Sequence, residues 1–591
     1  MRKTRVRRLT AMAMSVFMAA MTLGSVTGYA AEETSEAVTE AVSEEAGQTE
    51  GIGTVAVEGG LVQGVESDTE GVTLFKGIPY AADTSGENRW KEPQPVEPWE
   101  GVRVCDEWGD QAMQRPVEEL NPVGTIYGDE FYFNEDYDPP ISENGLNLNV
   151  YTPAQSPDEN LPVLVWIHGG ANNHGNASEM EFNASKLAAK GIIVVSVQYR
   201  MGMFGFLTLP GLAEESEHGV SGNYAVLDLV KSLEWVRDYI SGFGGNPDQV
   251  TIAGQSAGGY NVTALLRTPL AKGLFQNAIV QSQPRLIPNQ GDEIYNDMET
   301  MQETAEPIVK EALGLPEDAD SQEVVEELRS HDAEYFMNTK SASNPEEDLF
   351  DTITNINGSF AYVLDGYVFT EESVDLTRPG ALDGINLMVG STSNEMSTGY
   401  EPGGSLSLDD FAAEMAETYG ENWAEGYNPA DESEAYLMEI RAISDRWLGT
   451  FRLTSEYMNA NNEDMNAYTY YFDQNMPSHL NANRDDQFYG CFHSTELWYT
   501  FNSMRDMEGQ RAWTEEDYAL GDQISSYFAN FVKTGDPNGE GLPEWQVGSA
   551  ENDNAFMWWH NGTSEGVTST DVPERDALNL ELARNTLELP E

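Results

Sequence analysis

Residues 250–259 read Val-Thr-Ile-Ala-Gly-Gln-Ser-Ala-Gly-Gly and contain the pattern Gly-x-Ser-x-Gly. The β-branched residues before it predict a strand over 249–253, and the small residues after Ser256 predict the start of a helix. Such a sharp turn brings the residues two before and two after the serine together. Glycine fits at Gly254 and Gly258 because it lacks a Cβ. The pattern predicts that Ser256 is an exposed nucleophile, against the alternative of a glycine-rich packing turn.

Hydrophobic runs and helical patterns alternate on both sides of this turn. Further buried strands are predicted at 162–167, 191–199, 278–282 and 387–390. Apolar residues at helical spacing predict a helix over 223–239, and the acidic stretches 292–350 and 402–465 are also helical in pattern. This alternation predicts an α/β fold: a mostly parallel twisted central sheet flanked by helices, with the two acidic stretches as helical insertions over the active site.

The N-terminus has the pattern of an export signal. Five basic residues precede an apolar run from Leu9 to about Val26, followed by the small-x-small exit Gly28-Tyr29-Ala30. We expect residues 1–30 to be a signal peptide cleaved after Ala30 or Ala31, so that the chain is secreted. An uncleaved membrane anchor is the alternative. Residues 31–51 are acidic and predict a disordered linker, and 52–591 predict a single domain.

The composition limits the partners that the chain can bind. It carries 31 basic and 100 acidic residues, a formal net charge of −69, which disfavours nucleic acids and anionic membrane surfaces. The two cysteines, Cys105 and Cys491, are too few for a disulfide scaffold, and we expect unpaired buried thiols. No zinc-type histidine spacing occurs, so no metal or other cofactor is expected. The sequence makes no prediction of the oligomeric state.

A nucleophilic serine needs backbone donors for the oxyanion, a base and an orienting acid. Residues 166–172, Trp-Ile-His-Gly-Gly-Ala-Asn, follow a predicted strand, and their small residues leave backbone N–H groups accessible. The expected donors are therefore Gly170 and Ala171, with Ala257. From the local pattern His493 leads as the base, with His174 as its rival. A carboxylate near Glu395 follows a predicted strand, but many other carboxylates compete for the role of the acid.

Motifs in the order of a known family extend along residues 52–590. They include 75–81 (Phe-Lys-Gly-Ile-Pro-Tyr-Ala), 148–153 (Leu-Asn-Val-Tyr-Thr-Pro), 243–247 (Phe-Gly-Gly-Asn-Pro), the serine turn, and 534–538 (Thr-Gly-Asp-Pro-Asn). The chain thereby resembles the type B carboxylesterase and cholinesterase family of α/β-hydrolases. The resemblance implies a catalytic triad of Ser256, Glu395 and His493, because 390–395 and 490–496 match the family's acid and histidine motifs.

The chain departs from the family pattern close to the expected site. Gln255 stands where the family usually has glutamate. Ala171 and Asn172 replace a glycine and an aromatic residue. We therefore name Asn172, Asn173, His174 and Gln255 as candidate substrate-binding residues, which hint at polar esters.

Two other departures concern cysteines. Positions that often form a disulfide in the family look like Ala112 and Gly145 here, so that loop must be held by packing. Cys491 replaces the family's alanine near the histidine.

These observations predict a secreted serine carboxylic-ester hydrolase that acts on small-molecule esters through an acyl-enzyme. One alternative is a non-catalytic adhesion or interaction protein on the same fold, but the relatives of that kind lack triad residues. Another is an acyltransferase or amidase with the same triad, which product partition between water and an added alcohol would distinguish.

Overall fold

The computed structural model describes residues 51–289, 295–356, 362–479, 486–507 and 509–590. The expected signal peptide and residues 31–50 of the expected linker lie outside these ranges. Residues 50–591 group into one compact unit. Within the described ranges, no helix has the length and hydropathy needed to cross a bilayer.

A large mixed sheet forms the centre of this unit. Among the described residues it has eleven strands in the order β16-β15-β14-β13-β10-β9-β7-β8-β6-β4-β3. The neighbours from β15 to β8 run parallel, and the remaining pairs are antiparallel. The strands are β3 (Val65–Glu66), β4 (Thr73–Pro79), β6 (Asn147–Thr152), β7 (Leu161–Ile167), β8 (Ile193–Val197), β9 (Gly245–Gln255), β10 (Asn277–Gln281), β13 (Asn386–Thr392), β14 (Ala467–Asp473), β15 (Phe556–His560) and β16 (Thr563–Val567). The predicted α/β-hydrolase fold is confirmed.

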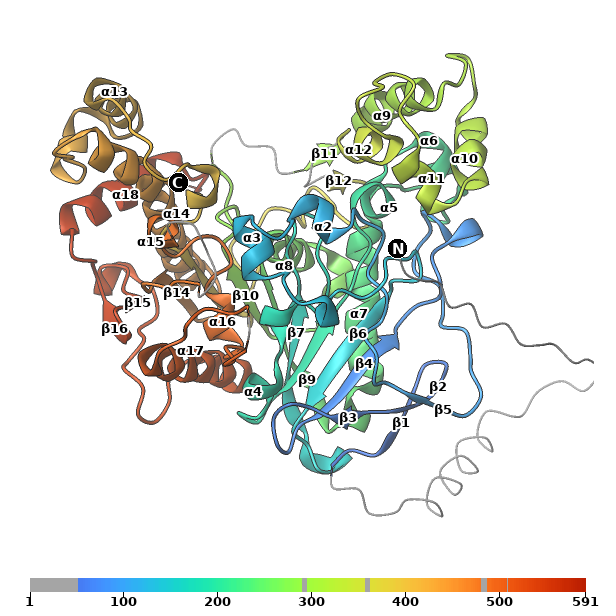
Figure 1. Cartoon of the computed structure of the whole chain (residues 1–591), viewed down its shortest axis with the longest axis horizontal. Coiled ribbons are helices and arrows are strands. Elements are labelled where there is room, and N and C mark those ends of the chain that lie inside the picture. The colour runs from blue at the N-terminus through green and yellow to red at the C-terminus, as the bar shows by residue number, and fades with distance from the viewer. Residues whose placement is uncertain (1–50, 290–294, 357–361, 480–485, 508, 591) are drawn as a thin grey trace, which may run out of the picture. The chain divides into compact units, whose positions relative to one another are not determined.

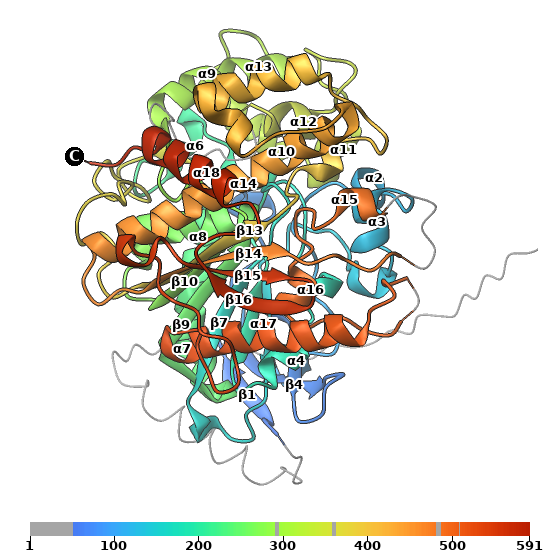
Figure 2. The ribbon, with the colours of Figure 1, turned by 90° about the vertical axis from the view of Figure 1, so that its left-hand side faces the viewer.

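The central strands are buried on both faces because helices cover both. Along β7, Val163, Val165 and Ile167 pack into one core cluster, whereas Leu164 and Trp166 pack into the other. The first face carries α7 (Tyr224–Tyr239), α8 (Ala257–Arg267) and α14 (Glu432–Asn461). The second face carries α4 (Ser185–Ala188), α16 (Leu497–Thr500) and α17 (Glu515–Thr534), and Figure 2 shows α17 lying along the sheet.

Helices form in both acidic stretches, as the sequence predicts. The first contains α9 (Met298–Leu313), α10 (Ser321–Ser330), α11 (Ala333–Asn338) and the start of α12 (Leu349–Thr354), and the second contains α13 (Leu408–Tyr419) and α14. Figure 1 shows α9–α12 at the upper right and α13 with α14 at the upper left, both above the sheet. Some of the acidic residues have a local structural role, because aspartates cap the N-termini of α9, α10, α11, α12 and α14.

Smaller elements complete the fold. A three-stranded sheet contains β1 (Thr54–Val57), β2 (Gly60–Gln63) and β5 (Val102–Val104), and a two-stranded one contains β11 (Asn296–Asp297) and β12 (Val363–Leu364). The other helices are α2 (Val117–Leu120), α3 (Ile126–Glu130), α5 (Gly202–Phe206), α6 (Pro210–Glu215), α15 (Asp486–Tyr489) and α18 (Pro573–Thr586).

The state of both cysteines agrees with the expectation of unpaired, buried thiols. Cys105 and Cys491 are buried free thiols. Ala112 and Gly145, the positions of the missing disulfide, lie against each other, since a Cβ on Gly145 would be 2.8 Å from the Ala112 Cα. Hydrogen bonds hold this loop instead, including one from Gln111 Nε2 to the carbonyl of Pro139 at 2.6 Å.

Candidate active site

The register of the parallel strands brings four loops to one edge of the sheet. Gly254 near the end of β9 pairs with Ile167 of β7 and Val280 of β10, and Gln281 pairs with Gly390 of β13. The segments that follow these strands therefore lie side by side. Ligand sites of open α/β sheets lie at this carboxyl edge.

Ser256 occupies the turn between β9 and α8. Its backbone has φ 57 and ψ −124, a conformation that is strained for a residue with a Cβ. A Cβ on Gly254 would lie 2.4 Å from the carbonyl carbon of Gly258, and one on Gly258 would lie 2.0 Å from the Ile167 oxygen. Both glycines are therefore required by close backbone approach, which confirms the reason given for them from the sequence.

The loop after β7 presents backbone N–H groups. Gly170, Ala171 and Asn172 all have positive φ, at 97, 54 and 57. A Cβ on Gly170 would be 2.0 Å from the carbonyl oxygen of His174, so only glycine fits there. Among the described residues, the backbone N–H groups of Gly170, Ala171 and Ala257 donate no hydrogen bond. These three donors are free to bind an anionic oxygen.

Asn172 is buried beneath this loop. Its Oδ1 accepts hydrogen bonds from Asn261 Nδ2 at 2.9 Å and from the Tyr199 hydroxyl at 3.3 Å, and its Nδ2 donates to the Tyr362 hydroxyl at 3.3 Å. The prediction that Asn172 contacts substrate stays a prediction. Its contacts favour a role in holding the strained loop.

Asn173 and His174 interact with each other. His174 Nδ1 lies 2.6 Å from Asn173 Oδ1, and burial lowers the pKa of His174 to about 4. No carboxylate lies within ion-pair distance of His174 in the described part of the chain. A base of the triad type needs an acid partner, so these contacts disfavour His174 as the base.

His493 meets Glu395 although 98 residues separate them. A short bridge between Asn394 and Phe492 aligns the two loops, and Asn394 N donates to the Cys491 carbonyl at 3.1 Å. His493 Nδ1 then lies 2.5 Å from Glu395 Oε2. Burial opposes protonation of the imidazole, but the charge and hydrogen bond of Glu395 outweigh it and raise the pKa of His493.

Hydrogen bonds with neighbouring polar groups fix the position of Glu395. Its Oε1 accepts hydrogen bonds from the Ser282 hydroxyl at 2.6 Å and from Thr392 N at 2.7 Å, while its N–H donates to Ser444 Oγ at 2.9 Å. Glu496 is also buried beside Ser282, and burial together with the charge of Glu395 raises its pKa to about 8. The sequence analysis gives no role to Ser282, Ser444 or Glu496, although Glu496 lies within the family motif at 490–496.

Gln255 lies between the serine turn and the imidazole. Its Nε2 is 3.2 Å from His493 Nε2 and 3.4 Å from Nδ1, and its Oε1 accepts a hydrogen bond from the Ser494 hydroxyl at 3.1 Å. Among the described residues, Ser256 Oγ has no hydrogen bond to the imidazole. Gln255 therefore contacts the imidazole of His493 directly, and whether it also contacts substrate stays a prediction.

Comparisons with known proteins agree with this geometry. Residues 53–572 match the carboxylesterase family. The para-nitrobenzyl esterase of Bacillus subtilis (strain 168) is 32% identical over 498 residues, covering 83% of this chain and 91% of that protein. Carboxylesterase 5A of Felis catus is 31% identical over 516 residues, covering 82% and 87%.

Solved structures give the same result. A structure of PNB esterase has a TM-score of 0.66 and 28% identity, covering 89% of this chain and 99% of that one. A carboxylesterase structure from Geobacillus stearothermophilus has a TM-score of 0.65 and 27% identity, with coverage of 89% and 99%. The chain therefore belongs to the carboxylesterase family and is a carboxylic ester hydrolase with the α/β-hydrolase fold.

Proposed function

We propose that this enzyme hydrolyses small-molecule carboxylic esters through an acyl-enzyme on Ser256. His493 Nε2 accepts the proton of the serine hydroxyl as it attacks the ester carbonyl, and then donates that proton to the leaving alcohol. Water, activated by the same imidazole, releases the acid. Glu395 holds the imidazole through Nδ1 and stabilises its cation.

The oxyanion of each tetrahedral intermediate binds to the N–H groups of Gly170, Ala171 and Ala257. What supports this assignment is that all three lack an acceptor in the described residues and flank the serine. Two of them, Gly170 and Ala171, lie on a loop with positive φ values, and the buried side chain of Asn172 holds this loop through its hydrogen bonds. Donors fixed before the reaction need no rearrangement as charge develops, and one such donor is typically worth about 10²–10³ in rate.

The single observation that carries the proposal is the 2.5 Å contact between His493 Nδ1 and Glu395 Oε2, beside the turn that exposes Ser256. A buried carboxylate on Nδ1 leaves Nε2 to accept a proton. The bond from the serine hydroxyl to Nε2 is of a kind that often tightens only with substrate bound.

Rapid-mixing hydrolysis of short-chain p-nitrophenyl esters tests the mechanism. We expect a burst of nitrophenol stoichiometric with enzyme, abolished in Ser256→Ala and His493→Ala, whose folding is checked by circular dichroism. Glu395→Gln should retain the fold and lose most of the turnover. A folded Ser256→Ala variant that keeps the burst would overturn the assignment of the nucleophile. Partition of the acyl group to added methanol measures any transferase activity.

We also propose that the chain is exported. The basic and apolar pattern of residues 1–30 supports this, and so does the exit at Gly28-Tyr29-Ala30. N-terminal analysis of the culture medium should find a chain beginning at residue 31 or 32. An intact N-terminus in the membrane fraction would instead support an anchor, and one in the cytoplasm would exclude export.

A further inference from the structure

A cavity with positive charge borders the helix that follows Ser256. It has a volume of about 740 Å³ and is bordered by α8, the segment after β10, α14 and α18. Arg285 and Arg446 line it, and the described residues around it include no aspartate or glutamate. This is unusual in a chain with 100 acidic and 31 basic residues.

Neither arginine forms an ion pair in the described part of the chain. Their neighbours do: Arg441, five residues before Arg446 on α14, pairs with Asp445 and Asp473, and Arg575 on α18 also pairs with Asp445. Burial raises the pKa of Glu439, and Arg446 offsets this only in part. Glu439 therefore interacts electrostatically with Arg446, but no ion pair joins the two side chains among the described residues.

The cavity is built on the segments that build the active site. Tyr260, which lines it, donates its N–H to the Ser256 carbonyl at 3.0 Å. Pro284 and Arg285 follow Ser282, whose hydroxyl holds Glu395. Trp447 comes one turn after Ser444, which accepts the N–H of Glu395. The lining therefore lies within a few residues of the groups that build the active site, although it includes none of Ser256, Glu395 and His493.

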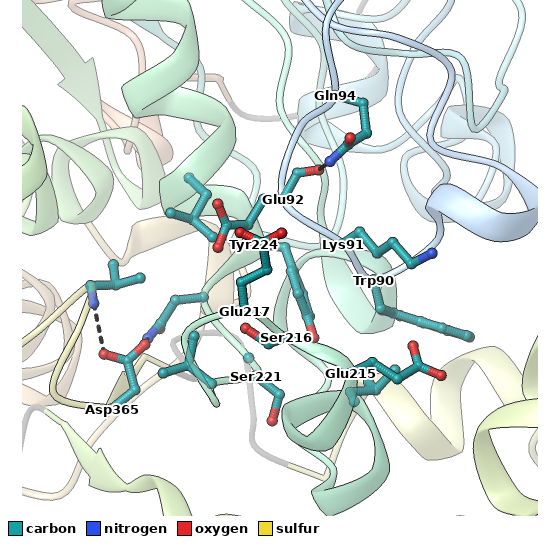
Figure 3. Close-up of a pocket in the computed structure, with 16 residues that line it drawn as sticks. Trp90, Lys91, Glu92, Gln94, Glu215, Ser216, Glu217, Ser221, Tyr224 and Asp365 are labelled. Atoms are coloured by element: carbon teal, nitrogen blue, oxygen red, sulfur yellow. Dashed lines mark hydrogen bonds between the residues drawn. The ribbon is translucent and has the colours of Figure 1, made fainter. Parts of the chain in front are cut away.

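The positive lining is not a general feature of the cavities. Another cavity has a volume of about 430 Å³. Its lining, shown in Figure 3, includes Glu92, Glu215, Glu217 and Asp365, and Lys91 is its single basic residue among those described. The two cavities differ in the charge of their lining, while neither lining includes Ser256, Glu395 or His493.

We propose that Arg285 and Arg446 bind a carboxylate carried by the substrate, so that the enzyme prefers esters that bear a second, free carboxylate. A guanidinium matches a carboxylate with two parallel N–H···O bonds, which gives selectivity as well as affinity. The local pair of positive charges also offsets the repulsion of an anion by the acidic surface. This inference rests on the proposed ester hydrolysis at Ser256.

The test compares matched esters in the enzyme lacking residues 1–31. Monoethyl adipate carries the carboxylate on the acyl side, 6-acetoxyhexanoate carries it on the alcohol side, and ethyl pentanoate and pentyl acetate are the neutral partners. We expect kcat/KM to favour at least one anionic ester over its neutral partner. In the double variant Arg285→Gln/Arg446→Gln that ratio should fall about tenfold or more, mainly through KM. The acyl-side and alcohol-side pairs identify which part of the substrate enters the cavity.

Lys272→Gln is the matched control, because Lys272 also has no ion pair among the described residues but lines a different cavity. It should leave the anionic-to-neutral ratio unchanged. The inference is overturned if the double variant leaves both ratios at their original values, while the neutral esters are still hydrolysed in a Ser256-dependent manner. If no ester is hydrolysed by the folded enzyme, the proposed function fails and this inference fails with it.

Discussion

The contact between Gln255 and His493 predicts that residue 255 sets the pH range of the enzyme. The amide nitrogen of Gln255 lies 3.2 Å from Nε2 of the imidazole and places no charge there. Gln255→Glu puts a carboxylate at this position with little change in size. An opposite charge within about 4–6 Å stabilises the protonated imidazole.

The size of the effect follows from the geometry. Two unit charges about 4 Å apart interact by about 4 kcal/mol at an effective dielectric constant of about 20. At about 1.4 kcal/mol per unit, this corresponds to an upper limit of about 3 pKa units. Rotation of the carboxylate toward Ser494 reduces it, so we expect the pKa of His493 to rise by about 1–3 units above its already raised value.

The assay is the pH dependence of kcat/KM for a neutral p-nitrophenyl ester. The imidazole must be neutral to accept the serine proton, so a raised pKa moves the acid limb of the profile to higher pH. Activity at the high-pH plateau should change much less than activity near pH 6. Gln255→Met, of similar length and without charge, separates the electrostatic effect from packing. An acid limb that stays in place or moves to lower pH in Gln255→Glu would refute this reasoning.

Three further predictions concern stability. Gly258→Ala should destabilise the fold by about 1–3 kcal/mol and reduce activity, because its Cβ would lie 2.0 Å from the Ile167 oxygen. In thermal melts, Gly53→Ala, which meets nothing within 4 Å, should show no loss. Burial alone would raise the pKa of Glu130, but the interactions with Arg511 and His479 outweigh burial and lower this pKa to about 2. Glu130→Gln should therefore cost about 3 kcal/mol at neutral pH. The stabilisation by Glu130 is complete above its unfolded pKa near 4.5 and is lost as pH falls toward 2, so urea titrations of wild type and variant should converge over that range. Ala112→Cys/Gly145→Cys should form a disulfide that stabilises the oxidised protein by up to about 4 kcal/mol, less the strain of the 2.8 Å approach at residue 145. Melting temperatures that are equal with and without reductant would contradict this.

The sequence predicts well what local patterns determine. The strand runs at 162–167 and 249–253 appear as parts of β7 and β9, and the helix predicted at 223–239 is α7. The alternation of predicted strands and helices is sufficient to predict the fold class. β14 is missed, although its residues 467–473 read Ala-Tyr-Thr-Tyr-Tyr-Phe-Asp. This run comes soon after the long helical pattern of α14. Both faces of β14 are buried, so it lacks the alternation of apolar and polar residues that identifies a half-buried strand.

The site is less predictable because it is made of distant segments. Local pattern identifies Ser256 and its loop, since backbone geometry requires glycines there. Local pattern gives His493 a lead over His174 and leaves the acid open, and the resemblance to a family settles the choice of Glu395 and His493. What joins them is the bridge between Asn394 and Phe492, and a contact across 98 residues leaves no local trace. The same holds for Arg285 and Arg446, which line one cavity without an ion pair among the described residues, an arrangement that becomes visible only once the chain is folded.

At Ser256 the backbone conformation opposes thermodynamic stability to the proposed catalytic role of the same residue. With φ 57 and ψ −124 it occupies a region that only glycine enters without cost. Such conformations cost about 1–3 kcal/mol, and interactions elsewhere in the fold must offset this cost. Ser256→Gly should therefore give a protein that is more resistant to denaturation and chemically inert. Selection for thermal tolerance alone, in a library without a functional screen, would favour loss of this side chain, and engineering for robustness has to hold residue 256 fixed.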